Sequence, residues 1–162
     1  QRYYDPFRNV VGIMINRAAQ AKNIIIYGDG EQKRSFSDVR DCIIAVERIM
    51  NSNRKDLCGQ VFNIGPDDNE MSIRQLATIV TQLSEIYIKF DYYPDRPREV
   101  KDAYCSSDKI RKEFNYNAAT PAKQTISDMV DWIKPMAREF EYHLPIELVT
   151  DQTPKTWTDK LI

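Results

Sequence analysis

The sequence has little of what metal sites and disulfide frameworks require. Its 162 residues include one histidine and three cysteines. Cys42, Cys58 and Cys105 stand far apart and outside any CxxC pattern, so we expect neither a zinc site nor a disulfide framework. The pattern is typical of reduced, buried thiols in a cytosolic protein. The single histidine, His143, is expected to be structural or exposed to solvent.

The sequence also lacks an excess of charge and any long apolar run. Its 23 basic and 24 acidic side chains leave a formal net charge of -1, which favours neither nucleic acid nor a membrane as a partner. The early apolar run VVGIMI is too short to cross a bilayer or to form a signal-peptide core. Because the chain begins at Gln1 instead of methionine, we expect a processed chain or a fragment.

Motifs that carry catalysis are missing as well. We find no Ser-His-Asp order, no HExxH motif and no pair of carboxylates in a convincing context. Neither a GxGxxG nor a GxxxxGK loop is present, and these are the usual phosphate-binding motifs of nucleotide sites. The sequence therefore predicts no catalytic residue in this chain, and binding is the function to look for.

The apolar pattern predicts alternating helices and strands, and hence an α/β fold. Helices are expected over 9–22, 39–51, 73–83 and 107–114 and from Pro121 onward. Strands are expected over 23–28, 34–36, 60–65 and 86–93. The first two strands are predicted to form a hairpin around Asp29 and Gly30, and the proline-rich segment 94–102 is predicted to be a loop.

Helix caps and the end of the chain complete this organisation. Ser37 or Asp38 is expected to cap the helix that follows, and Ser72 and Gln75 have the spacing of a capping box. We expect residues 1–137 to form one lobe. Residues 138–162 are predicted to be an extended tail that packs on a neighbour through its aromatic side chains.

Arg34 and Arg96 are the first candidates for a binding site. Both stand in or beside predicted loops and not on a helix face. A guanidinium group can bind phosphate oxygens through two parallel hydrogen bonds, which lets a near-neutral protein hold one small anion. A solvated surface arginine has the same appearance in a sequence, so this alternative stays open for both residues.

A helix start and an aromatic residue extend the candidate site. The helix expected to begin near Asn9 offers backbone N–H groups and a positive dipole end, which suit a small anion. An ordinary helix start is the alternative. Tyr27 ends a predicted strand just before two glycines, where its ring could stack on a flat ligand or belong to the core.

Five segments occur in an order that is known from one enzyme family. They read RNVVGIMIN, IIIYGDGEQKRSFSDVRD, GQVFNIG, MSIRQLA and RPREVKDAYCSSDKI. Together they resemble the C-terminal half of the extended short-chain dehydrogenase/reductases, over residues 5–135. Those proteins are NAD-dependent nucleotide-sugar epimerases, dehydratases and decarboxylases. The start DPFRNVVGIMIN is most similar to UDP-glucose 4-epimerase-like members.

The resemblance implies a nucleotide sugar as the single ligand of these residues. In the family, an arginine after the GDG turn and an arginine in the RPxD loop hold the diphosphate, and they match Arg34 and Arg96. The helix start that meets the diphosphate matches Asn9 and Val10.

The nucleoside end of the ligand has its own matching positions. The aromatic residue that lies against the base matches Tyr27. The acid that contacts the ribose matches Glu99, where the family has Asp. At 106–109 the family's DxSK is SSDK here, which affects a helix cap and not the substrate.

The family's dinucleotide loop, GxxGxxG, and its catalytic YxxxK pair are both absent. The resemblance therefore implies a substrate-binding lobe of a cytoplasmic UDP-glucose 4-epimerase-like enzyme. NAD and the catalytic tyrosine would belong to an N-terminal Rossmann domain, so this chain is not expected to be active alone. Without that domain we expect an exposed apolar face, through which the chain could associate into a homo-oligomer. A 4,6-dehydratase, a decarboxylase and a non-catalytic binding module remain alternatives.

Overall fold

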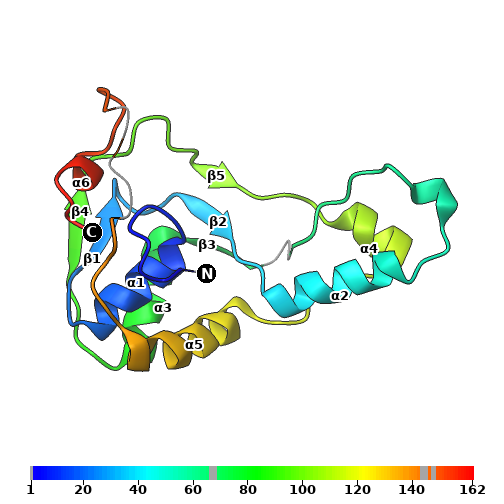
Figure 1. Cartoon of the computed structure of the whole chain (residues 1–162), viewed down its shortest axis with the longest axis horizontal. Coiled ribbons are helices and arrows are strands. Elements are labelled where there is room, and N and C mark those ends of the chain that lie inside the picture. Colours follow the sequence, from blue (N-terminus) through cyan, green and yellow to red (C-terminus); the bar gives the residue numbers. More distant parts are fainter. Residues whose placement is uncertain (1, 66–68, 143–145, 147–148) are drawn as a thin grey trace. The chain divides into compact units, whose positions relative to one another are not determined.

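The computed structural model describes residues 2–65, 69–142, 146 and 149–162, and it confirms the predicted α/β class (Figure 1). The chain divides into two compact units. Unit 1 comprises Gln1–Gln32, Ser72–Lys101 and Ile126–Ile162, and unit 2 comprises Lys33–Met71 and Asp102–Thr125. The prediction for His143 falls outside the described residues.

Unit 1 is built around two parallel strands and the helices that cover them. Its elements are α1 (Val10–Ala19), β1 (Ile24–Tyr27), α3 (Ile73–Ser84), β4 (Phe90–Tyr93), most of α5 (Ala122–Ile133), the short turn η2 (Lys134–Met136) and α6 (Lys155–Thr158). β1 runs parallel to β4, with Ile24 opposite Phe90 and Tyr27 opposite Tyr93. Because the strands are parallel, both end at the same edge.

Apolar side chains from these elements form the core of unit 1. α1 packs against β1 and α3, as the periodic apolar residues of both helices predict. The fully buried side chains come from both strand and helices: Met14, Ile15, Ala18, Ile24, Ile26, Leu76, Ala77, Val80, Ile126 and Ile133.

Unit 2 contains a second small sheet and a separate apolar cluster. Its elements are β2 (Lys33–Ser35), α2 (Val39–Met50), η1 (Lys55–Leu57), β3 (Glu70–Ser72, with Ser72 counted in unit 1), β5 (Asp102–Ala103) and α4 (Asp108–Phe114). β2 lies between β3 and β5. Ala45, Ile110 and Tyr116 form the cluster, against which Phe62 and Phe114 pack.

The predicted caps are confirmed. Asp38 caps α2, where its carboxylate accepts a hydrogen bond from the Arg40 backbone N–H at 2.8 Å. Ser72 and Gln75 form the capping box of α3: the Ser72 hydroxyl accepts from the Gln75 N–H at 3.1 Å, and the Gln75 side chain accepts from the Ser72 N–H at 2.8 Å. These helix starts are local features, which is why the sequence predicts them.

The predicted hairpin is wrong. β1 pairs with β4, whereas β2 belongs to the other sheet and runs parallel to β5. The turn at Asp29 and Gly30 does form, with the Gly30 N–H donating to the Tyr27 carbonyl at 3.3 Å. It redirects the chain out of one sheet into another. Each of the two strands therefore pairs with a strand that is distant in sequence, and not with its neighbour.

Two other strand predictions need correction. Residues 60–65 form no strand, because no described segment pairs with them. Buried and exposed side chains nevertheless alternate along this segment, since Phe62 and Ile64 pack on the unit 2 cluster while Val61 is 80% exposed. The strand predicted over 86–93 is shortened to Phe90–Tyr93, because β1 offers only four residues for pairing.

The predicted burial of the cysteines is also wrong. Cys58 and Cys105 are exposed and Cys42 is half-buried, and all three are free. Cys58 follows η1 in a surface loop and Cys105 follows the end of β5, so neither is on the inner face of an element. No helix in the described part of the chain is long and apolar enough to span a bilayer.

α2 exposes one apolar face to solvent. Val39, Ile43, Val46 and Met50 are all exposed, while Ala45 on another face of the helix is fully buried. A contiguous apolar stripe on a helix usually lies against another part of the protein or a partner. The apolar face expected for the isolated chain stays a prediction, for which this stripe is the candidate.

Candidate functional site

A cleft of about 550 Å³ opens in unit 1 where β1 and β4 end. Gly28, Asp29 and Gln32 line it on the side that follows β1. The other side is formed by the segment after β4: Asp95, Arg96, Arg98, Glu99 and Lys101. This volume lies within the range of about 300–1,000 Å³ that is usual for small-molecule sites.

A tight turn presents Arg96 and Glu99 side by side. The Glu99 N–H donates to the Arg96 carbonyl at 3.1 Å, and Arg98 has a φ of 58°. Proline at the second position and positive φ at the third are features of a type II turn, where glycine is usual at the third position. Across this turn the Arg96 Nε donates to a Glu99 carboxylate oxygen at 2.5 Å.

Tyr27 joins this pair from the end of β1. The Arg96 guanidinium carbon lies 4.9 Å from the centre of the Tyr27 ring, which is a cation–π arrangement. At the far end of the ring, the Tyr27 hydroxyl shares a hydrogen bond with the Thr156 hydroxyl. Burial raises the pKa of the Tyr27 phenol, although its hydrogen bond with Thr156 and the Arg96 charge act in the opposite direction.

Gly28 allows the two sides of the cleft to approach each other. Its N–H extends the parallel ladder by donating to the Tyr93 carbonyl at 2.8 Å. With a φ of 60°, its backbone is in the left-handed region, and a Cβ at this position would collide with the Asp95 carboxylate. Asp29 holds the next turn, because its carboxylate accepts from the Glu31 N–H at 2.9 Å.

Three cationic and three acidic side chains line the cleft, which suits a ligand that carries both anionic groups and hydroxyl groups. A guanidinium has five N–H donors, and the Arg96–Glu99 contacts engage Nε and Nη2, so donors remain for an anion. Arg98 and Lys101 add positive charge to the same cleft. The Glu99 carboxylate can accept hydrogen bonds from hydroxyl groups, whereas arginine and lysine side chains can only donate.

The structure brings together three of the six residues that the sequence nominated. Tyr27, Arg96 and Glu99 form one cluster. Arg34 lies on β2 in unit 2, where its Nη1 donates to the Lys33 carbonyl at 2.6 Å. Asn9 precedes α1 with a φ of 64° and without a side-chain cap, and Val10 begins that helix. A common ligand for all six residues stays a prediction.

Sequence reasoning missed three residues of this region. Arg98 and Lys101 stand in the same proline-rich loop as Arg96, so the concentration of cations in that loop was a readable signal. Thr156 contacts Tyr27 across a separation of 129 residues. No local pattern in the sequence announces that contact.

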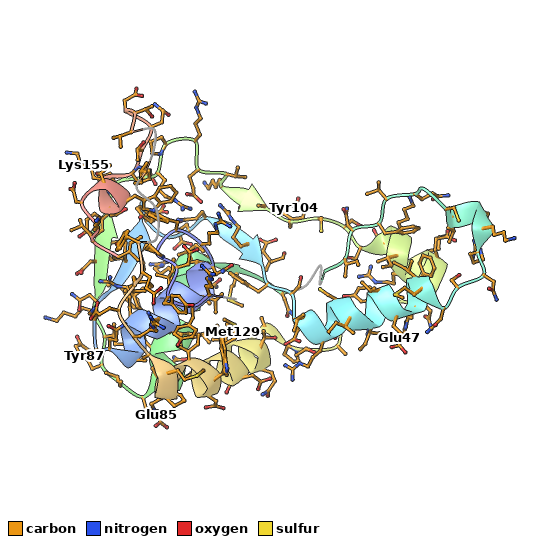
Figure 2. All side chains as sticks on the ribbon, in the orientation of Figure 1. Glu47, Glu85, Tyr87, Tyr104, Met129 and Lys155 are labelled. Atoms are coloured by element: carbon orange, nitrogen blue, oxygen red, sulfur yellow. The ribbon has the colours of Figure 1, made fainter. Side chains whose placement is uncertain are left out.

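Other candidate sites carry less chemistry. A hollow of about 730 Å³ in unit 2 lies beside α2 and α4 and is lined by Glu47, Arg48 and Lys112, among others (Figure 2 labels Glu47). None of the residues implied by the sequence lines it. Within the described ranges, no group of three or more His, Cys, Asp or Glu side chains could hold a metal ion.

Nor do the residues present fit a dinucleotide cofactor. NAD sites of this class use a glycine-rich turn that joins a strand to the N-terminus of a helix. Gly28 and Gly30 do follow β1, but the segment after them enters β2 and not a helix. We therefore assign no part of an NAD site, and no step that uses NAD, to the residues of this chain.

Comparisons with known proteins agree with the fold. The family model described as GDP-mannose 4,6 dehydratase matches residues 3–129. A curated relative, the UDP-N-acetyl-alpha-D-glucosaminuronate decarboxylase of Bacillus cytotoxicus, is 26% identical over 135 residues, which are 80% of this chain and 41% of the decarboxylase.

Solved structures of epimerases and a dehydratase share the fold. The UDP-glucuronic acid 4-epimerase of Bacillus cereus, in complex with UDP-glucuronic acid and NAD, has a TM-score of 0.73 at 23% identity, over 79% of this chain and 40% of the epimerase. The UDP-glucose 4-epimerase of Thermotoga maritima with UDP-glucose has a TM-score of 0.73 at 21% identity, over 83% of this chain and 43% of the epimerase. The dTDP-glucose 4,6-dehydratase of Bacillus anthracis with NAD has a TM-score of 0.69 at 22% identity, over 82% of this chain and 42% of the dehydratase. This chain spans about two-fifths of the length of these relatives.

Proposed function

The chain belongs to the GDP-mannose 4,6 dehydratase family, and we propose that it forms the nucleotide-sugar-binding part of an NAD-dependent epimerase that resembles UDP-glucose 4-epimerase. The membership confirms its resemblance to the epimerases and dehydratases of the extended short-chain dehydrogenase/reductases. The observation that carries the proposal is the cleft at the ends of β1 and β4, where Tyr27, Arg96 and Glu99 meet.

Four residues that line the cleft and the adjacent Tyr27 have roles in this proposal. Arg96 donates hydrogen bonds to the diphosphate, and Arg98 and Lys101 add positive charge beside it. Glu99 accepts hydrogen bonds from the ribose hydroxyls. Tyr27 lies against the base. The open ends of parallel strands are where α/β proteins usually bind such ligands.

Three further residues complete the proposed binding site. The start of α1, at Asn9 and Val10, contributes backbone N–H groups to the diphosphate. Arg34 is proposed as a second phosphate-binding arginine. An N-terminal Rossmann domain is proposed as the partner that holds NAD, and NAD would accept and return the hydride. We also propose a cytoplasmic location and a homo-oligomeric assembly.

A second candidate function is that of a 4,6-dehydratase or a decarboxylase. The description of the matching family favours the first and the curated relative favours the second. Binding preference separates some of these functions. The epimerase proposal predicts that UDP and UDP-glucose bind more tightly than GDP and GDP-mannose, and the reverse order would favour the family's namesake reaction. A non-catalytic module predicts only weak affinity for nucleotide sugars.

The test is calorimetric titration of UDP and UDP-glucose into the 162-residue chain. Arg96→Ala should weaken binding by about 1.5–3 kcal/mol, the range for a hydrogen bond to a charged group, and Arg34→Ala should do the same. Arg111→Ala is the matched control, because Arg111 is an arginine on α4 that pairs with Asp108 at 2.7 Å and does not line the cleft. Absence of saturable binding to the wild-type chain, or equal losses in all three variants, would reject the proposed site.

A further inference from the structure

Residues 154–162, called here the C-terminal segment, contact the Tyr27 side chain next to the cleft. α6 lies beside the strands β1 and β4 (Figure 1), and its first residue, Lys155, is labelled in Figure 2. Thr156 is only 1% exposed, and its hydroxyl shares a hydrogen bond with that of Tyr27. The family match ends at residue 129, so this contact involves a segment beyond it.

Several contacts hold this segment independently of the Thr156 hydroxyl. The buried guanidinium of Arg17 donates to the Leu161 carbonyl at 3.1 Å, and the Leu161 N–H donates to the Thr156 carbonyl at 3.0 Å. The Tyr142 hydroxyl donates to the Ile162 carbonyl at 3.0 Å. Trp157 meets Phe7 edge to face, with ring centres 5.3 Å apart. Removing one hydroxyl should therefore leave the segment in place.

We propose that the C-terminal segment shapes the cleft indirectly, with Thr156 as a positioning residue that fixes the Tyr27 ring beneath Arg96, which lines the cleft. A tyrosine ring is attached at one end and can move about its side-chain torsions. The hydrogen bond at the other end restricts that movement, and the fixed ring face then holds the guanidinium 4.9 Å from its centre. Fixing both groups before binding removes part of the ordering cost when a ligand arrives.

A ligand-free measurement tests the positioning itself. The ring current of Tyr27 should shift the Arg96 Nε–H resonance in the NMR spectrum of the full 162-residue chain. Thr156→Val removes the hydroxyl at nearly constant volume, and we expect this resonance to move toward its position in a Tyr27→Leu variant, which has no ring. Thr156→Ser keeps a hydroxyl and should resemble the wild type.

A second variant removes the Tyr27 hydroxyl itself, and with it the hydrogen bonds to Thr156 and to Trp157. Tyr27→Phe keeps the ring, and it should move the Arg96 resonance at least as far as Thr156→Val does. This variant keeps the test decisive if Thr156→Val folds poorly by circular dichroism. An Arg96 resonance that stays at its wild-type position in Tyr27→Phe would overturn the proposal.

The effect on ligand binding rests on the proposed function, so it is measured separately with UDP. Thr156→Val should weaken UDP binding about fivefold, as expected for one neutral hydrogen bond, and Thr156→Ser should not. In a Tyr27→Phe background, Thr156→Val should have no further effect. An equal loss in that background would show that Thr156 does not act through Tyr27, which overturns the proposal. Failure of the wild-type chain to bind UDP rejects the proposed function, while the Arg96 resonance still decides whether Thr156 positions Tyr27.

Discussion

Replacing Asp38 should destabilise the chain in a way that depends on pH. Asp38 is 4% exposed at the start of α2. Its carboxylate accepts from the Arg40 backbone N–H at 2.8 Å, from the Thr125 hydroxyl at 2.8 Å, and from the Arg40 side chain at 2.8 and 2.7 Å. One carboxylate therefore caps α2 and links it to Thr125 on α5.

These contacts differ in what they contribute to stability. The Arg40 side chain is more than half exposed, so its ion pair contributes at most about 1 kcal/mol. The helix cap contributes about 1 kcal/mol. The half-buried Thr125 hydroxyl that loses its charged acceptor costs about 1–2 kcal/mol, the lower part of the range for a buried group. We expect Asp38→Ala to lower the free energy of unfolding by about 2–4 kcal/mol. Asp38→Asn keeps a cap acceptor and should cost about 1–2 kcal/mol.

The pH dependence follows from the pKa of Asp38. Hydrogen bonding by Arg40 is the main reason that this pKa is held well below its usual range in the folded chain. A carboxyl group with a lowered folded pKa stabilises the fold above its unfolded pKa of about 3.9. That contribution is lost as the pH falls from this value toward the folded pKa. The stability difference between wild type and Asp38→Asn should therefore be complete at pH 7 and smaller at pH 3.

Urea unfolding followed by far-UV circular dichroism at pH 7, 5 and 3 measures these differences. Asp56→Asn is the matched control, because Asp56 also binds an arginine, Arg54, but lies on the surface. We expect its effect to be small at every pH. The reasoning is refuted if Asp38→Asn is as stable as wild type at pH 7, or if its deficit is the same at pH 3.

Three other predictions concern the cleft and the exposed face of α2. Gly28→Ala should lower the melting temperature more than Gly59→Ala does. Both glycines have positive φ, so both variants carry about 1 kcal/mol of backbone strain, but only at Gly28 does a side chain occupy the space of a Cβ. Equal losses of melting temperature in the two variants would contradict the collision. Arg98→Asn should weaken UDP binding without lowering the melting temperature, because asparagine tolerates positive φ; unchanged calorimetric affinity would remove Arg98 from the site. Val46→Glu should reduce concentration-dependent association in sedimentation velocity without reducing stability. Lys123→Glu is the control, because Lys123 is an exposed residue of α5 and lies outside the stripe. Association that persists in Val46→Glu would show that another surface is responsible.

Most helices could be predicted from the sequence because their signals are local; α6 could not, since it lies in the segment predicted to be an extended tail. The Ser72 and Gln75 spacing specifies a capping box within four residues, and both of its hydrogen bonds are present. The pairing of strands has no such local signal. The turn after Tyr27 has the residues of a hairpin turn, yet β1 pairs with β4, which begins more than sixty positions later. The segment 60–65 keeps strand-like alternation and still forms no strand, since alternation does not provide a partner.

The candidate site was predictable to the same extent. Arg96 and Glu99 are three positions apart in a turn that contains proline, so their contact is local. The loop identified Arg96, whereas Glu99 was implied only by the resemblance to the family. Tyr27 reaches them only through the parallel register that sets Tyr27 opposite Tyr93. Thr156 comes from the far end of the chain, and its burial depends on contacts such as that between Arg17 and Leu161.

The parallel pairing of β1 with β4 determines how the cleft is built. A hairpin would have placed the segment after Tyr27 next to its own return strand, with one turn between them. The parallel pair instead sends two separate segments, after Tyr27 and after Tyr93, out of the same edge. Gly28 lets them approach until the Asp95 carboxylate fills the space of a Cβ. Since neither segment forms the cleft alone, its geometry depends on the packing of α3, which precedes β4 and contacts both β1 and α1. Substitutions in the core of α3, such as at Leu76, should therefore disturb ligand binding although they lie outside the cleft.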